Sequence, residues 1–164
     1  MWDKSILTLD RLAARGCNRL LTTTCVLCFA DEETVDHLFH ACPFVIRLWN
    51  FLTSTFRLPS FPRSVQDLWE RWRPKLPNSV RDVGHLISRA LLWNVWLERN
   101  ARIFRESFSA HSIILRKIIH MFLLWVDAVP ESKKARFNEP TATAKHSLDF
   151  LIDNTRAGED DLAK

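Results

Sequence analysis

Three cysteines and a histidine fall within residues 25–42 of a chain of 164 residues. They form the pattern C-x2-C-x8-H-x4-C, made by Cys25, Cys28, His37 and Cys42. A C-x2-C pair places two thiolates on one tight turn, and Cys3His is a ligand set that structural zinc takes. The spacing therefore predicts a Zn2+ site with these four residues as ligands.

The second half of this pattern must bend before its two ligands can meet. Residues 33–39 begin like a helix, with acidic residues near its N-terminus, where the macrodipole favours them. On an unbroken helix His37 and Cys42 would point about 140° apart, because each residue turns about 100°. Pro43 disfavours helical geometry at Cys42, so we expect the helix to end there and Cys42 to swing back toward the ion. His40 is a competing ligand, but its spacing to Cys42 is tighter, and we favour His37.

Two other interpretations of the cluster stay open. The cysteines can be small buried hydrophobic residues and His37 a surface histidine, since free cysteine is often buried. The C-x2-C pair can also be a redox site, but such a pair normally follows a strand of an α/β fold, which the sequence does not show. Because four protein ligands leave no open position, the expected role of the zinc is structural. Cys17 is expected to be a lone buried thiol.

The elements that must position the cluster are expected to be helices. With 47% apolar residues, seven Trp and eleven Phe, the chain can bury one sizeable core. Capping signals, prolines and apolar residues at helical spacing mark the segments. They predict a short helix between Thr8 and Gly16, a helix that begins at Pro43, and helices over 64–72, 80–105 and 110–129.

The expected fold is mostly α: a small helical domain around a Cys3His zinc knuckle, followed by long amphipathic helices and a loose C-terminal tail. Prolines and changes in composition divide the chain at two points. We expect a zinc-binding domain over 1–58, a helical extension packed on it over 59–130, and a polar, partly disordered tail over 131–164 with a short helix around 148–152.

Basic charge is concentrated in the middle of the chain. Residues 57–117 contain twelve Lys/Arg against five Asp/Glu, whereas acidic residues are in excess on both sides. Attraction for phosphate backbones should be strongest there, and the alternative is a solvated basic surface. Trp69 and Trp72 can stack on unpaired bases, but their spacing favours the core. The candidate cations for nucleic-acid binding are Arg71, Arg73, Lys75, Arg81, Arg99, Arg102 and Arg105.

Several classes of function are disfavoured. The apolar run at 118–126 is too short to cross a bilayer, and the N-terminus lacks the continuous apolar core of a secretory signal. We therefore expect an intracellular protein, in the nucleus or cytoplasm, without a membrane partner. None of the three glycines belongs to a phosphate-cradling loop, so we expect no enzymatic activity and no small-molecule substrate.

At this level of detail the sequence resembles a known family. The quoted segments are ILTLDRLAARG, then CVLCFADEETVDHLFHACPFVIRLW, then LLWNVWLERNARIF, and together they span roughly residues 5–108. They are similar to the zinc-binding domain at the C-terminal end of plant non-LTR (LINE-type) retrotransposon reverse transcriptases. The shared features are Arg-Gly after a leucine-rich helix, the two cysteine motifs around His-Leu-Phe, and a later Trp-x-x-Trp-x-x-Arg-Asn segment.

The resemblance implies a zinc module that helps to hold RNA or DNA. The chain departs from the family in three respects: most of the helical segment before the leucine-rich helix is expected to be missing, Phe29 stands where glycine is common, and no polymerase motif is present. Phe29 is expected to strain the knuckle if it takes a positive φ. The alternative function is an orphaned structural or protein-interaction fragment that keeps its zinc site without any nucleic-acid role.

Overall fold

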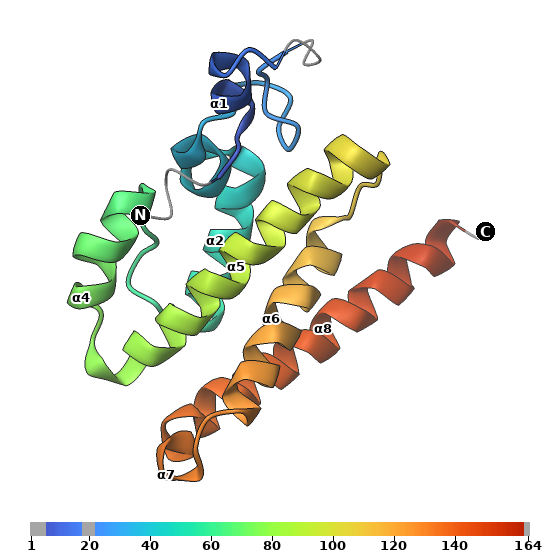
Figure 1. Ribbon diagram of the computed structural model, residues 1–164. Coiled ribbons are helices and arrows are strands. Elements are labelled where there is room, and N and C mark those ends of the chain that lie inside the picture. Colours follow the sequence, from blue (N-terminus) through green and yellow to red (C-terminus); the bar gives the residue numbers. More distant parts are fainter. Residues whose placement is uncertain (1–5, 18–21, 163–164) are drawn as a thin grey trace.

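The computed structural model describes residues 6–17 and 22–162 and consists mainly of helices (Figure 1). The β-structure found among those residues is one isolated antiparallel bridge between Thr24 and Glu32. The expectation of a mostly α fold is confirmed. The elements are α1 (Leu9–Ala14), the π-helical turn η1 (His37–Ala41), α2 (Pro43–Thr55), α3 (Val65–Asp67), the π-helical turn η2 (Leu68–Trp72), α4 (Arg73–Lys75), α5 (Asn78–Arg105), α6 (His111–Asp127), α7 (Glu131–Lys134), the 3-10 turn η3 (Ala135–Phe137) and α8 (Asn138–Leu162).

Three long helices, α5, α6 and α8, form the main framework of the structure. Helix α6 packs against α5 on one side and against α8 on the other (Figure 1). Ile87 and Leu91 on α5 and Ile118 and Phe122 on α6 are fully buried, because their four-residue spacing places each pair on one helix face. Helix α5 ends where Glu106 takes a left-handed conformation with φ 51°.

Helix α2 connects the cysteine-rich segment, residues 25–42, to the long helices. Pro43 is its first residue, a position where a missing N–H costs nothing. Leu48, Trp49 and Leu52 are fully buried on one face of the helix. Trp49 also donates an indole hydrogen bond of 2.9 Å to the carbonyl oxygen of Phe39 in η1. One cluster of buried apolar residues therefore runs from the cysteine-rich segment to the C-terminal helices.

The C-terminal end differs from the expectation of a loose tail. Helix α8 begins at Asn138 and continues to Leu162. Phe137, Ala144 and Leu151 are buried at seven-residue spacing, which places them on one face toward the core. Pro140 is compatible with the helix because it lies in the first turn, where the backbone N–H has no intrahelical partner. Packing of this narrow apolar stripe on α6 stabilises a helix that its polar composition does not indicate.

Among the described residues, no helix combines the length and the apolar character that crossing a membrane requires.

Candidate metal centre

The four candidate ligands converge in space. One ligand atom from each of Cys25, Cys28, His37 and Cys42 lies within 4.8 Å of all the others. The Sγ atoms of Cys25 and Cys42 are 4.0 Å apart, and Sγ of Cys28 lies 3.4 Å from Nε2 of His37. Tetrahedral zinc with bonds of about 2.3 Å to sulfur and 2.0 Å to nitrogen places ligand atoms about 3.5–3.8 Å apart. The residues present therefore fit Zn2+ in number, type and separation.

The first two ligands lie on a tight loop closed by backbone hydrogen bonds. The N–H of Cys25 donates to the carbonyl oxygen of Asp31 at 2.8 Å, and the N–H of Phe29 donates to the carbonyl oxygen of Cys25 at 2.8 Å. The antiparallel bridge between Thr24 and Glu32 joins the two arms of the loop. The C-x2-C spacing thus brings both thiols to the same side of one turn, as zinc requires.

Phe29 occupies a left-handed backbone conformation in this loop. Its φ is 57°, and its side chain is 66% exposed, so it has little packing to lose. We expect Phe29→Asn to raise the free energy of unfolding of the zinc-loaded protein by about 1 kcal/mol, because asparagine tolerates this region better than other side chains. A urea melt measures the change. Phe29→Ala is the matched control: it removes the ring but keeps the backbone cost, so it should not stabilise. An equal gain from both variants would contradict this explanation.

The last two ligands meet through a π-helical turn. The N–H of Cys42 donates to the carbonyl oxygen of His37 at 2.7 Å, an i→i+5 bond. This wider turn takes in one more residue than an α turn, so residues five apart come round to the same side. Cys42 itself is extended, with φ −62° and ψ 125°, as the following Pro43 favours. The predicted helix break at Cys42 is confirmed, and the π turn supplies the geometry that an α-helix would not.

The local electrostatics favour thiolate at the cluster. Contact with the Cys42 thiol lowers the pKa of Cys25 against the opposing effect of burial, and the backbone N–H groups of Leu27 and Cys28 assist. The proton stays with Cys42, whose pKa is raised by the Cys25 contact and by burial. The N–H groups of Phe44 and Val45, at the start of α2, oppose that rise. Cys25, Cys28 and Cys42 would hold Zn2+ as thiolates, because coordinating thiols are deprotonated.

His40, the competing ligand, lies outside the cluster. Its side chain is 2% exposed and stacks on Trp49 with ring centroids 6.1 Å apart. Its Nδ1–H donates to the carbonyl oxygen of Pro62 at 3.1 Å, and burial lowers its pKa to about 4. His40 therefore acts as a neutral link between η1 and the segment before α3. Cys17, expected to be buried, is exposed, because it follows the end of α1 at Gly16 and lies outside the core.

Two of the candidate cations are buried and hold the cysteine-rich segment on α5. Arg99 is 2% exposed and forms a salt bridge of 2.8 Å with Glu33, whose side chain is completely buried. Glu33 also accepts a hydrogen bond of 2.9 Å from the N–H of Leu9, and Arg99 donates to the carbonyl oxygen of Leu7 at 3.2 Å. Burial raises the pKa of Glu33, and the Arg99 guanidinium opposes this effect. The pair thus joins the segment before α1, the cysteine loop and α5.

Arg102 binds the knuckle itself. Its guanidinium donates hydrogen bonds of 3.1 and 3.2 Å to the carbonyl oxygens of Val26 and Leu27, the two residues between the first two cysteines. It forms an ion pair of 2.9 Å with Glu98 and lies 4.6 Å from the centre of the Phe44 ring. The Trp-x-x-Trp-x-x-Arg-Asn segment of α5 and the residues after it therefore support the loop that carries Cys25 and Cys28.

The remaining candidate cations are more accessible. Arg71, Lys75, Arg81 and Arg105 are exposed and Arg73 is half-buried. The Arg81 guanidinium donates to the carbonyl oxygens of Leu76 and Pro74. The structure brings Arg71 of η2 and Lys75 of α4 to one pocket. Helix α4 lies near the first turns of α5 (Figure 1), whereas Arg105 is the last residue of that helix. Trp72 is 5% exposed, which confirms the expectation that it lies in the core.

Sequence reasoning did not identify two features of this region. Glu33 lies in an acidic stretch of the sequence, and the apolar Val35 and Leu38 that follow it are the available signal of its burial. Arg63, which lines the same pocket as Arg71 and Lys75, follows a proline and offered no periodic pattern. Their partners lie far along the chain, so only the fold reveals them.

Comparison with known proteins gives one match. Residues 1–49 match the model of the family described as zinc-binding in reverse transcriptase. A search of curated proteins and a search of solved structures found no match to the chain. The family match and the convergence of the Cys3His ligand atoms together support a structural Zn2+ ion in this chain.

Proposed function

We propose, from the match of residues 1–49 to the zinc-binding family of reverse transcriptases, that this chain is a non-catalytic zinc module that contributes to RNA or DNA binding. Cys25, Cys28, His37 and Cys42 are its proposed metal ligands, and the single observation that carries the proposal is their convergence within 4.8 Å. The further proposal is an origin in a plant non-LTR retrotransposon, by the resemblance of the motifs quoted above.

Zinc would act here on folding, not on a substrate. When bound, it supplies a four-ligand cross-link that adds its binding free energy to folding. The chain's own residues position the ligands: the π turn places Cys42 beside the other three, and Arg102 holds the Cys25–Cys28 loop on α5. The segment that resembles the family thereby fixes the position of η2 and α4, which carry basic side chains.

Exposed cations support the nucleic-acid part of the proposal. Arg71, Lys75, Arg81 and Arg105 are exposed, and arginine is well suited to phosphate contacts. Arg99 and Arg102 are left out of this proposed surface because their guanidinium groups are engaged inside the protein.

A salt titration tests this proposal. Binding of a fluorescent single-stranded RNA should be detectable by anisotropy at low salt, and log K should fall linearly with log salt with a slope of about −0.7 for each phosphate contact. Changing Arg71, Lys75 and Arg105 together to Glu should abolish binding while the thermal melt stays unchanged; Arg81 is kept in this variant because its guanidinium donates to the carbonyl oxygens of Leu76 and Pro74. Absence of binding at low salt by the zinc-loaded, unmodified protein would reject a nucleic-acid role.

The second candidate is a structural or protein-interaction fragment. Exposed apolar side chains favour this candidate. Trp93, Leu97 and Phe104 on α5 are 48%, 40% and 72% exposed, and their spacing places them along one side of the helix. A protein that keeps its zinc and its melt but shows no salt-dependent nucleic-acid binding would favour this candidate.

A further inference from the structure

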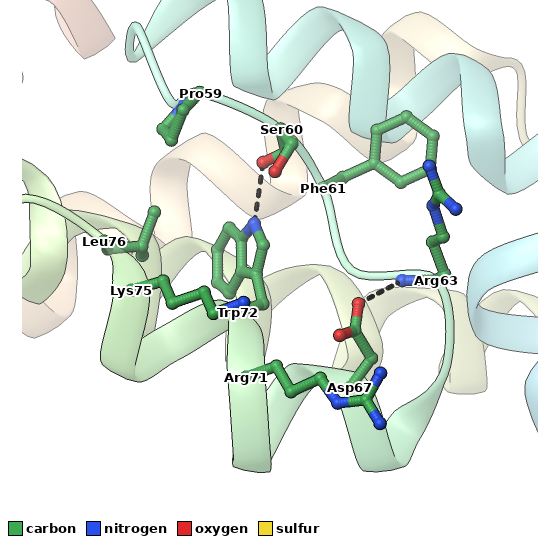
Figure 2. Close-up of a pocket in the computed structure, with 9 residues that line it drawn as sticks. All are labelled: Pro59, Ser60, Phe61, Arg63, Asp67, Arg71, Trp72, Lys75 and Leu76. Atoms are coloured by element: carbon green, nitrogen blue, oxygen red, sulfur yellow. Dashed lines mark hydrogen bonds between the residues drawn. The ribbon is translucent and has the colours of Figure 1, made fainter.

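An open pocket of about 240 Å³ lies between residues 59–63 and the helical segment that contains η2 and α4. Figure 2 shows the connecting segment on one side and Arg71, Trp72 and Lys75 on the facing helix. The lining is apolar at Phe61, Trp72 and Leu76. Trp72 is held by a hydrogen bond of 2.8 Å from its indole N–H to the carbonyl oxygen of Ser60.

The charges around this pocket are unbalanced. Arg63, Arg71 and Lys75 line it together with one carboxylate, Asp67. Within the described part of the chain, none of the ion pairs involves the side chains of these three cations. The Asp67 carboxylate, whose Oδ2 accepts a hydrogen bond of 2.9 Å from the backbone N–H of Arg63, offsets one of the three positive charges. The lining therefore keeps a net positive charge, and this favours an anionic ligand.

The pocket is also tied to the metal centre. Asp36, next to the candidate ligand His37, accepts a hydrogen bond of 2.8 Å from the N–H of Val65 at the start of α3. Beneath the pocket, Trp49 stacks on Phe61 and meets Trp72 edge-on, each with ring centroids 6.1 Å apart. These contacts fix both walls relative to η1, so the pocket is a formed feature of the zinc-dependent fold.

We propose that this pocket binds one unpaired nucleotide of a single-stranded nucleic acid, with its phosphate at Arg63, Arg71 and Lys75 and its base against Phe61, the half-buried aromatic side chain of the lining. The volume is below the range of about 300–1,000 Å³ that drug-sized ligands occupy, and it suits a single small unit. Guanidinium groups bind phosphate oxygens in pairs, and a base can rest on an aromatic surface. A duplex does not offer an isolated nucleotide to a concave site. This inference rests on the proposed function and names its ligand.

Charge reversal in the pocket tests the inference. Anisotropy with a fluorescent 12-nucleotide RNA, the DNA of the same sequence, and the corresponding duplex would be measured with zinc-loaded protein. Arg71→Glu/Lys75→Glu should weaken single-strand binding by about tenfold or more at low salt and reduce the salt slope by about 0.7, as expected when the one phosphate in the pocket is no longer neutralised. Lys117→Glu/Lys133→Glu changes the net charge equally on α6 and α7 and should have a much smaller effect.

A second pair of variants is expected to change single-strand affinity in the opposite direction. Asp67→Asn removes the one acidic group of the pocket while its side-chain oxygen can still accept from Arg63, so single-strand affinity should rise by about two- to fivefold. Asp127→Asn makes the same charge change at an exposed position on α6 and should change the affinity less. This pair does not depend on loss of binding, and hence not on a variant that fails to fold.

The outcomes separate the pocket from the general proposal. RNA and DNA single strands that bind alike support recognition of the phosphate and base, and a preference for one identifies the sugar as a further contact. Equal effects of the pocket and control pairs, or duplex binding as tight as single-strand binding, would overturn the pocket while the nucleic-acid role stands. If the unmodified protein binds no nucleic acid at low salt, the proposed function and this inference both fall.

Discussion

Cys42→Ser is expected to abolish stoichiometric zinc binding and to lower the melting temperature steeply. Cys42 is completely buried, 4.0 Å from Cys25, and its loss leaves three ligands. Structural zinc contributes an apparent binding free energy of about 10–16 kcal/mol, which equals or exceeds the whole stability of a typical domain, about 5–15 kcal/mol. The variant should therefore lose the fold around the metal.

Metal content and a thermal melt measure this effect. Mass spectrometry of the unmodified protein should give one zinc per chain, and a chelator should lower its melting temperature in the same way as the substitution. Helices α5, α6 and α8 share buried residues away from the metal centre, so part of the helical circular dichroism signal should survive. This surviving signal would place the damage in the N-terminal part of the chain.

Cys17→Ser is the matched control for the zinc experiment. Cys17 is exposed and is not part of the cluster, so the zinc content and melting temperature of the Cys17→Ser protein should equal those of the unmodified protein. An unchanged zinc content and melt in Cys42→Ser would remove Cys42 from the ligand set. No zinc in the reduced, unmodified protein would overturn the structural role of the metal.

Arg99→Met is expected to lower the free energy of unfolding by about 3–5 kcal/mol. The substitution leaves the buried Glu33 carboxylate without its partner, and an uncompensated buried charge is strongly destabilising. A urea melt monitored by circular dichroism measures the loss. Arg105→Met is the matched control on the same helix: its side chain is exposed, so the change should stay within about 0.5 kcal/mol.

A double variant distinguishes the buried charge from lost packing. Glu33→Gln removes the carboxylate charge but keeps an oxygen that can accept from the N–H of Leu9. The Glu33→Gln/Arg99→Met protein should therefore be more stable than Arg99→Met alone, a coupling that measures the charge pair directly. If Arg99→Met costs less than about 1 kcal/mol, the pair does not hold the fold in this way.

The Arg99→Met variant also separates two roles for arginine in this chain. Arg99 joins the cysteine loop to α5, so its replacement should affect nucleic-acid binding only through unfolding. At a temperature where Arg99→Met stays folded, RNA affinity should equal that of the unmodified protein. Arg71 and Lys75 should show the opposite behaviour, with weaker RNA binding and an unchanged melt.

The spacing of the cysteines and histidine and of the apolar residues predicts the Cys3His cluster and the helical character of the fold. The four ligand types and their spacing indicated the cluster, because the chemistry of zinc restricts both. Pro43 indicated the break at Cys42, because its ring restricts the residue before it. Apolar spacing indicated α5 and α6, because helix periodicity is a local property that short segments reveal. These predictions depend on neighbours within a few turns.

Which charged side chains are buried and which are exposed depends instead on contacts between distant segments. Arg99, Arg102 and Arg105 look alike in the sequence, but the side chains of Arg99 and Arg102 are buried against partners about 65 to 75 residues away, and Arg105 is exposed. The helix over the C-terminal segment likewise depends on α6, since three buried side chains outweigh a polar composition. Burial and pairing are set by contacts between distant segments, and a local pattern carries no information about which distant surface it will meet.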